Sequence, residues 1–168
     1  SVLFTNPAKN ITLVEAGDVM RIEKREDYNI QDVLCFLSAQ GEMLVNEFIK
    51  LMVFDALIGE QDRHWQNWGF LLKDGTKQFA PFYDNADSLM SEFLYNDERL
   101  LKFDKDGSSP QLIAYINKSR MSLYNKSNNS KIKSFDMIRY LRDKYKNKLL
   151  EEGSRLEIIN EENISNIL

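Results

Sequence analysis

The sequence is organised around residues 54–89, which read FDALIGEQDRHWQNWGFLLKDGTKQFAPFYDNADSL. Three polar residues stand out in this stretch: Asp62, Asn67 and Asp84. Asn67 follows Asp62 by five positions, and Asp84 follows Asn67 by seventeen. In phosphoryl transfer from a metal-bound nucleotide, one carboxylate orients the attacking hydroxyl, while an amide and a second carboxylate hold Mg²⁺. The order and spacing of the three residues favour such a site.

A buried helix is predicted over residues 42–58, immediately before these polar residues. Its apolar residues recur at helical spacings and fill most of the circumference: Leu44, Val45, Phe48, Leu51, Met52, Val53, Phe54, Leu57 and Ile58. A helix that is apolar nearly all round is buried. Gly59 is expected to end it, so that residues 60–67 emerge from the end of a rigid element, where polar groups are well placed for chemistry.

A hairpin is predicted next, with strands at residues 68–72 and 78–83. The Asp74-Gly75 pair between them is a strong turn signal. The hairpin would return Asp84 towards Asn67. The sequence therefore predicts that Asp62, Asn67 and Asp84 converge on one cleft at the end of the 42–58 helix.

The other segments predict a mainly α protein, α+β overall, built as a helical bundle with one small hairpin. Residues 1–28 alternate between short apolar runs and turn residues and are expected to be extended. The Asn/Ser/Lys-rich run at 125–133 is expected to be a solvated loop. Further helices are predicted after an Asn29 cap to about Ala39, around 112–116, over 135–149 after a Ser134 cap, and over 155–168.

Composition narrows the classes of partner. The chain has 168 residues, a formal net charge of -4 and 43% hydrophobic residues, typical of one globular domain. An acidic chain has no general attraction for phosphate backbones, so nucleic acid is not expected as a direct partner. No stretch is long and apolar enough for a membrane span and no signal peptide is visible, which predicts a cytoplasmic protein without a membrane partner.

Asp62-Arg63-His64-x-x-Asn67, followed by Tyr83-Asp84, resembles the C-terminal lobe of HipA-type kinases. These are bacterial serine/threonine kinases of toxin–antitoxin modules. The strong part of the resemblance covers residues 45–90. It implies one protein-kinase-like domain over 1–168, in which 1–28 is an extended inter-lobe segment and 29–168 a helical lobe. It further implies Mg²⁺ and ATP as cofactors, a protein substrate that is phosphorylated on Ser or Thr, and an antitoxin protein as a possible partner.

The resemblance also implies a role for each residue of the motif. Asp62 would be the catalytic acid that orients the substrate hydroxyl. His64 would be a second catalytic residue, donating a hydrogen bond to the transferring phosphate. Asn67 and Asp84 would bind Mg²⁺ and, through it, the nucleotide. Arg63 is expected to be a structural partner for a carboxylate such as Asp55 or Asp84.

The sequence departs from a complete kinase, and other interpretations stay open. All seven glycines are isolated, so a Gly-rich phosphate loop and its N-terminal ATP-binding lobe are missing from it. The Asp-Arg-His-x-x-Asn string also resembles phosphoinositide 3- and 4-kinases, although those lipid kinases keep an Asp-Phe-Gly where this chain has Tyr83-Asp84-Asn85. A catalytically inactive interaction module is a further alternative. A metal-dependent hydrolase with Asp62, His64 and Asp84 as ligands is the weakest, since a lone histidine offers few nitrogen ligands.

Overall fold

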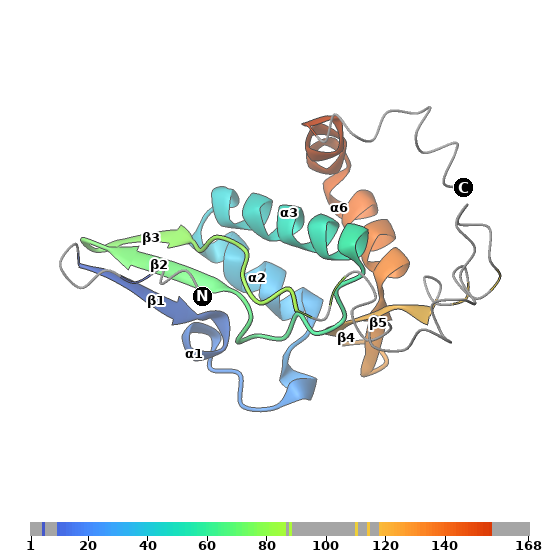
Figure 1. The fold of residues 1–168 in the computed structure, drawn as a ribbon, viewed down its shortest axis with the longest axis horizontal. Helices are drawn as coiled ribbons and strands as arrows, with labels where there is room; N and C mark the ends of the chain where they lie inside the picture. Colours follow the sequence, from blue (N-terminus) through green and yellow to red (C-terminus); the bar gives the residue numbers. More distant parts are fainter. Residues whose placement is uncertain are drawn as a thin grey trace.

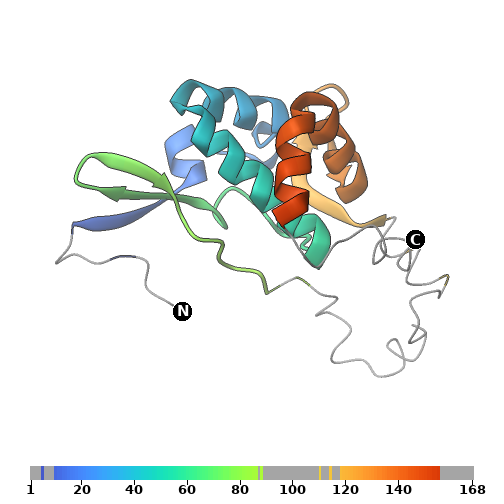
Figure 2. The same cartoon turned by 90° about the horizontal axis from the view of Figure 1, so that it is seen from above.

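The computed structural model describes residues 5, 10–86, 88, 110, 114 and 118–155. Its elements lie in the following order: β1 (Ile11–Glu15), α1 (Ala16–Met20), the 3-10 helix η2 (Arg25–Asp27), α2 (Ile30–Gln40), α3 (Glu42–Ile58), β2 (Gly69–Lys73), β3 (Thr76–Phe79), β4 (Arg120–Asn125), β5 (Ser130–Lys133) and α6 (Ser134–Arg155). Figures 1 and 2 both place the sheet β1–β3 at one end of α2 and α3, and β4, β5 and α6 at the other.

Helix α3 is the centre of the core, and α2 and α6 pack against it. The predicted bounds, residues 42–58, are confirmed. Its buried apolar residues are Leu44, Val45, Phe48, Ile49, Leu51 and Met52. Each such side chain contributes about 1.5–3 kcal/mol when fully buried, so packing rather than local propensity holds this helix in place. Gly59 ends the helix in the left-handed region, at φ 67°, which glycine adopts without steric cost.

The three-stranded sheet fixes the start of β2, directly after the predicted site residues. β1 pairs with β2 and β2 with β3, all antiparallel. Gly69 lies opposite Glu15, and a Cβ at Gly69 would lie only 2.2 Å from the Val14 carbonyl oxygen. Only glycine allows the strands to approach so closely. One residue earlier, the buried Trp68 indole donates a hydrogen bond of 2.7 Å to the Tyr28 hydroxyl.

The second sheet is a correction to the predicted architecture. Residues 120–125 and 130–133 form the antiparallel pair β4–β5, although residues 125–133 were expected to be a solvated loop. Met121, Leu123 and Ile132 on these strands are buried, and only the turn between the strands carries the exposed polar run. The fold is therefore α+β with two small sheets, and the mainly α, kinase-like helical bundle with a single hairpin was wrong. Apolar burial on two short strands outweighed their polar composition.

The remaining segments agree only in part with the elements predicted from the sequence. Asn29 caps α2 as predicted, its Oδ1 accepting a 2.9 Å hydrogen bond from the Asp32 amide. The expected extended segment 1–28 contains β1, but residues 16–20 form α1 instead. Helix α6 begins at Ser134 as expected and continues through Gly153 to Arg155, with a kink at Tyr145. The helix predicted around 112–116 lies outside the described residues except for residue 114, as does nearly all of the one over 155–168.

The described helices include none whose length and apolar character together would suit a membrane crossing.

Candidate active site

The loop between α3 and β2, residues 59–68, carries three of the four predicted site residues. Its backbone is fixed by short hydrogen bonds around Asp62. The Asp62 amide donates to Oε1 of the buried Glu60 at 2.7 Å. The Asp62 carbonyl accepts from the His64 amide at 2.7 Å and from Nδ2 of Asn67 at 3.0 Å. The loop thus holds the Asp62 backbone, while its side chain remains 50% exposed and available to a substrate.

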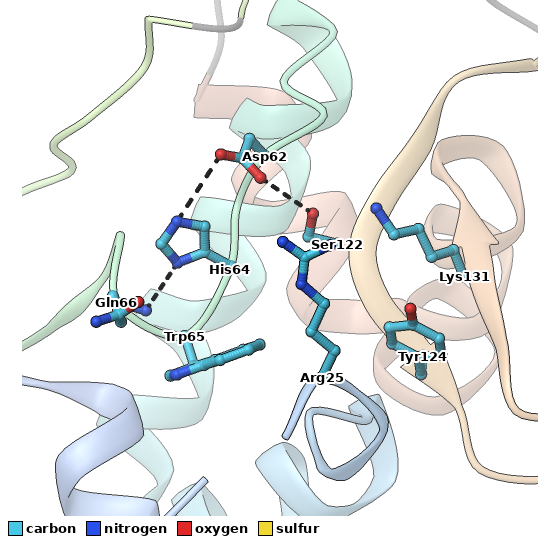
Figure 3. Close-up of a pocket in the computed structure, with 8 residues that line it drawn as sticks. All are labelled: Arg25, Asp62, His64, Trp65, Gln66, Ser122, Tyr124 and Lys131. Atoms are coloured by element: carbon cyan, nitrogen blue, oxygen red, sulfur yellow. Dashed lines mark hydrogen bonds and ion pairs between the residues drawn. The ribbon is translucent and has the colours of Figure 1, made fainter. Parts of the chain in front are cut away.

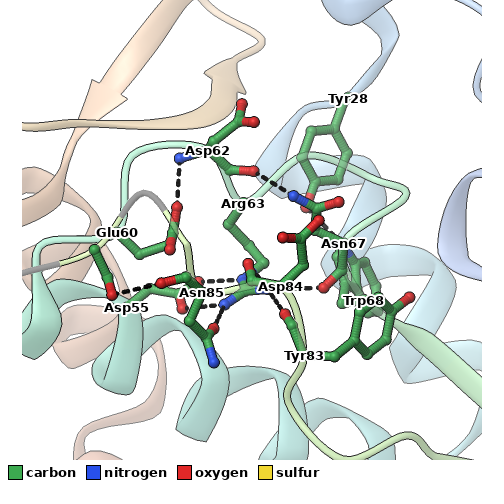
Figure 4. Close-up of polar contacts among 11 residues, drawn as sticks. Tyr28, Asp55, Glu60, Asp62, Arg63, Asn67, Trp68, Tyr83, Asp84 and Asn85 are labelled. Carbon is green, nitrogen blue, oxygen red and sulfur yellow. Dashed lines mark hydrogen bonds and ion pairs between the residues drawn. The ribbon is translucent and has the colours of Figure 1, made fainter. Parts of the chain in front are cut away.

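Arg63 anchors this loop to the end of α3 (Figure 4). Its Nε and Nη2 donate to the two carboxylate oxygens of Asp55, both at 2.9 Å, and both side chains are fully buried. The expected pairing of Arg63 with Asp55 is confirmed. Burial alone would lower the pKa of the Arg63 guanidinium, but the hydrogen bonds and charge of Asp55 raise it, so Arg63 stays charged. Burial raises the pKa of the Asp55 carboxyl to about 6, and the hydrogen bonds from Arg63 oppose this rise.

The same guanidinium also holds the segment after β3. Its Nη1 donates to the carbonyl oxygens of Asn67 at 2.7 Å, Tyr83 at 2.6 Å and Asp84 at 3.5 Å. Its Nη2 also donates to the side-chain oxygen of Asn85. One buried side chain therefore joins α3, the end of the 59–68 loop and residues 83–85. This bridge brings the backbone of Asp84 next to that of Asn67.

Asn67 and Asp84 present oxygens to the same space, and we call them the oxygen pair. Figure 4 draws the Asp84 carboxylate beside the Asn67 amide. Nδ2 of Asn67 donates to the Asp62 carbonyl, and among the described residues neither Oδ1 of Asn67 nor the Asp84 carboxylate has a hydrogen-bond or ion-pair partner. Asp84 is exposed and has φ 54°, a left-handed conformation that Asp tolerates. An amide and a carboxylate oxygen are ligands that suit Mg²⁺ completed by phosphate oxygens and water.

His64 lies beside Asp62 on the same loop. Its Nδ1 accepts a hydrogen bond of 3.2 Å from the Gln66 amide, so the proton of the neutral imidazole is on Nε2. That Nε2 lies 3.8 Å from Oδ2 of Asp62. Within the described residues, no three His, Cys, Asp or Glu side chains form a group that could hold a metal ion. Asp62, His64 and Asp84 therefore do not form the ligand set that a metal-dependent hydrolase would need.

Asp62 and His64 border a pocket of about 140 Å³, which we call the Asp62 pocket (Figure 3). Trp65 and Gln66 from the same loop line it as well. Its other lining residues come from distant segments: Arg25 from η2, Ser122 and Tyr124 from β4, and Lys131 from β5. The Ser122 hydroxyl donates to the Gln61 carbonyl at 3.0 Å and lies 3.5 Å from Oδ1 of Asp62.

Sequence reasoning missed these four distant residues. Arg25 lies in a run that was expected to be extended, and Lys131 in the supposed solvated loop. The alternation of apolar and polar residues around Ser122, with Met121 and Leu123 buried on either side, was the one signal that could have predicted β4. No signal within the sequence links position 62 to position 122.

The chain belongs to the family of HipA-like C-terminal domains, whose family model matches residues 6–159. Among solved structures, it is similar to the crystal structure of a Helicobacter pylori proinflammatory kinase, CtkA, with a TM-score of 0.62 and 22% sequence identity. This likeness shows a shared fold. It covers 94% of this chain but 65% of the CtkA chain, so the 168 residues span about two thirds of that protein's length. Comparison with curated proteins found no significant match.

Proposed function

We propose that this chain is the C-terminal catalytic portion of an ATP- and Mg²⁺-dependent HipA-like protein kinase that phosphorylates a Ser or Thr hydroxyl. One observation carries the proposal. Arg63 holds the 59–68 loop and residues 83–85 together, Nδ2 of Asn67 contacts the Asp62 carbonyl, and the Asp62 side chain lines a pocket. Phosphoryl transfer needs a nucleotide site and an acceptor site that meet at one carboxylate.

The residues take the following parts in this proposal. The Asp62 carboxylate orients the acceptor hydroxyl and accepts its proton. The Nε2 proton of His64 is available for a hydrogen bond to an oxygen of the transferring phosphate. Oδ1 of Asn67 and the Asp84 carboxylate would hold Mg²⁺, which when bound neutralises charge on the phosphates. The groups that grip the rest of ATP are proposed to come from residues outside this sequence.

The family suggests the setting of the activity. HipA-type kinases belong to bacterial toxin–antitoxin modules, and we propose a protein substrate and an antitoxin protein as partners, in the bacterial cytoplasm where ATP is available. Neither a nucleic acid nor a membrane is part of the proposal.

The full-length protein carrying Asp62→Asn or Asp84→Asn tests the proposed roles. Asp62→Asn should lower radiolabelled phosphate transfer by at least about 100-fold, the usual contribution of a general base, with ATP affinity nearly unchanged. Asp84→Asn should instead weaken binding of Mg²⁺–ATP in a nucleotide titration, because it removes charge from the metal site. Asp74→Asn, in the exposed turn between β2 and β3, is the matched control and should change neither.

Full activity in Asp62→Asn would contradict the proposal and favour an interaction module or His64 as the proton acceptor. Equal loss of transfer in Asp74→Asn would show that the effect is not specific to the site.

A further inference from the structure

The Asp62 pocket carries an excess of positive charge on an otherwise acidic chain. Arg25 and Lys131 are two of its eight lining residues, and Asp62 is the only carboxylate among them. The formal net charge of the whole chain is -4, so the two cations do not reflect a generally basic surface. The pocket is therefore locally suited to an anion.

Neither cation has a side-chain partner in the part of the chain that the structure describes. Among the described residues, the side chains of Arg25 and Lys131 take part in no hydrogen bond or ion pair. The neighbouring Lys126 is different, because it pairs with Asp32 at 2.7 Å. Figure 3 shows Arg25 reaching up between Trp65 and Tyr124 towards Ser122, with Lys131 on the wall formed by β5. Arg25 from η2 and Lys131 from β5 thus line the Asp62 pocket without a partner among the described residues.

Contacts between residues far apart in the sequence hold the segments that line the pocket in place. The Tyr124 amide donates to the Tyr28 carbonyl at 3.0 Å, which ties β4 to the segment that follows η2. Trp65 packs directly on Gly17, where a Cβ would lie 2.1 Å from the indole Cδ1. These contacts fix the elements that carry Arg25 and the aromatic wall. A site on fixed elements loses less entropy when it binds a ligand than a mobile surface does.

We propose that the Asp62 pocket binds an anionic side chain of the acceptor protein, a carboxylate or a phosphorylated residue, close in space to the hydroxyl that is phosphorylated. The inference rests on the proposed kinase function and adds the class of substrate to it. Because Asp62 repels an anion, the anionic group lies against Arg25 and Lys131. The hydroxyl lies against Asp62, and the acceptor chain spans the short distance between them.

Matched peptides with the full-length protein test the inference. Each peptide contains one serine, with Asp, phosphoserine or Lys placed in turn at each flanking position. We expect kcat/KM for the best acidic peptide to exceed that of its Lys counterpart by about tenfold, the effect of one well-placed charge pair. The Asp and phosphoserine arms distinguish the two sources of the anion. Anisotropy measurements of peptide binding to the Asp62→Asn protein give the same preference without any need for turnover.

Four charge-reversal variants test whether the preference for acidic peptides depends on the pocket. Arg25→Glu and Lys131→Glu should each abolish the preference for acidic peptides in both measurements. Lys24→Glu and Lys133→Glu change the net charge equally at positions outside the pocket, and the preference should survive in both. A preference that is absent, or that all four variants reduce alike, would overturn the inference.

The outcomes separate the pocket from the kinase function. Phosphate transfer without a charge preference would overturn the pocket inference alone. A binding preference that depends on Arg25 and Lys131, without phosphate transfer, would support the pocket and contradict the proposed kinase. Binding of vesicles that contain phosphatidylinositol phosphates, with no preference among peptides, would overturn the protein acceptor in favour of a lipid headgroup.

Discussion

The backbone of the oxygen pair is held by Arg63, a fully buried arginine, whereas the Asp62 pocket presents cations that no described residue neutralises. Arg63 donates to Asp55 and to three backbone carbonyls, so the backbone of Asn67 and Asp84 cannot shift without breaking buried or partly buried hydrogen bonds. Arg25, by contrast, is exposed and Lys131 is half-buried.

This difference means that the proposed metal site and the proposed acceptor pocket respond differently to substitution. A broken buried ion pair leaves an uncompensated charge and costs several kcal/mol, whereas an exposed charge changes at little cost. Substitutions in the pocket can therefore alter which acceptor binds while the geometry of the proposed metal site stays intact. Three experiments can break or sharpen this comparison.

The largest effect is expected for Arg63→Ala. The substitution leaves the Asp55 carboxylate buried without its cation and releases residues 83–85. We expect the free energy of unfolding, measured by urea denaturation, to fall by about 3–5 kcal/mol. Arg142→Ala, which removes an exposed pair with Asp143, is the control and should cost less than about 1 kcal/mol. Similar losses in the two variants would mean that Arg63 does not anchor the site.

A smaller effect is expected for Ser122→Ala, on the pocket side. The variant loses the hydrogen bond to the Gln61 carbonyl, which contributes about 1 kcal/mol to stability. It also removes the hydroxyl that lies 3.5 Å from Asp62, so we expect phosphate transfer by the full-length protein to fall less than about tenfold. Ser119→Ala breaks a comparable buried contact with Ser134 and should lower stability without slowing transfer. Equal transfer rates in the two variants would show that Ser122 does not influence Asp62.

The smallest effect concerns Asp32, which ties α2 to the turn between β4 and β5. A hydrogen bond from Lys126, and a second from Asn29, lower the pKa of Asp32 below its ordinary value of 3.8. The stabilisation is therefore fully present above that value and is lost as the pH falls through the lower, folded-state pKa. Urea denaturation between pH 6 and pH 2 should show the wild type losing its advantage over Asp32→Asn at the acid end. In a Lys126→Met background most of this pH dependence should disappear, and its persistence would assign it to another carboxyl.

The centre of the fold could be predicted because its signals are local. Helix α3 is apolar nearly all round, and the Asp74-Gly75 turn predicted the hairpin. Its second strand, predicted at 78–83, spans Thr76–Phe79 instead, and Arg63 holds Asp84 beside Asn67. Both observed turn residues have positive φ, 49° and 79°, which Asp and Gly accept. Arg63 was expected to pair with a carboxylate such as Asp55 or Asp84, and its partner is Asp55, eight positions away at the end of α3.

The pocket could not be predicted because its residues meet only through tertiary contacts. The register of β4 on β5 is set by the burial of Met121 and Leu123, and strand preference depends on such context more than helix preference does. The polar composition of 125–133 indicated a loop, whereas residues 130–133 form β5 with Ile132 buried. The catalytic and metal-binding roles of Asp62, His64, Asn67 and Asp84 stay predictions until the variants described above are measured.

The dependence of Asp62 on two distant parts of the chain also sets an order of assembly during synthesis. Everything that holds the oxygen pair has been synthesised once residue 85 is added, but the pocket wall is incomplete until Lys131 follows. At about 5–20 residues per second, the growing chain spends several seconds with the first half of its site available and the second absent. A nascent chain at this stage has no pocket with which to choose an acceptor, so selectivity is the last property of the site to form.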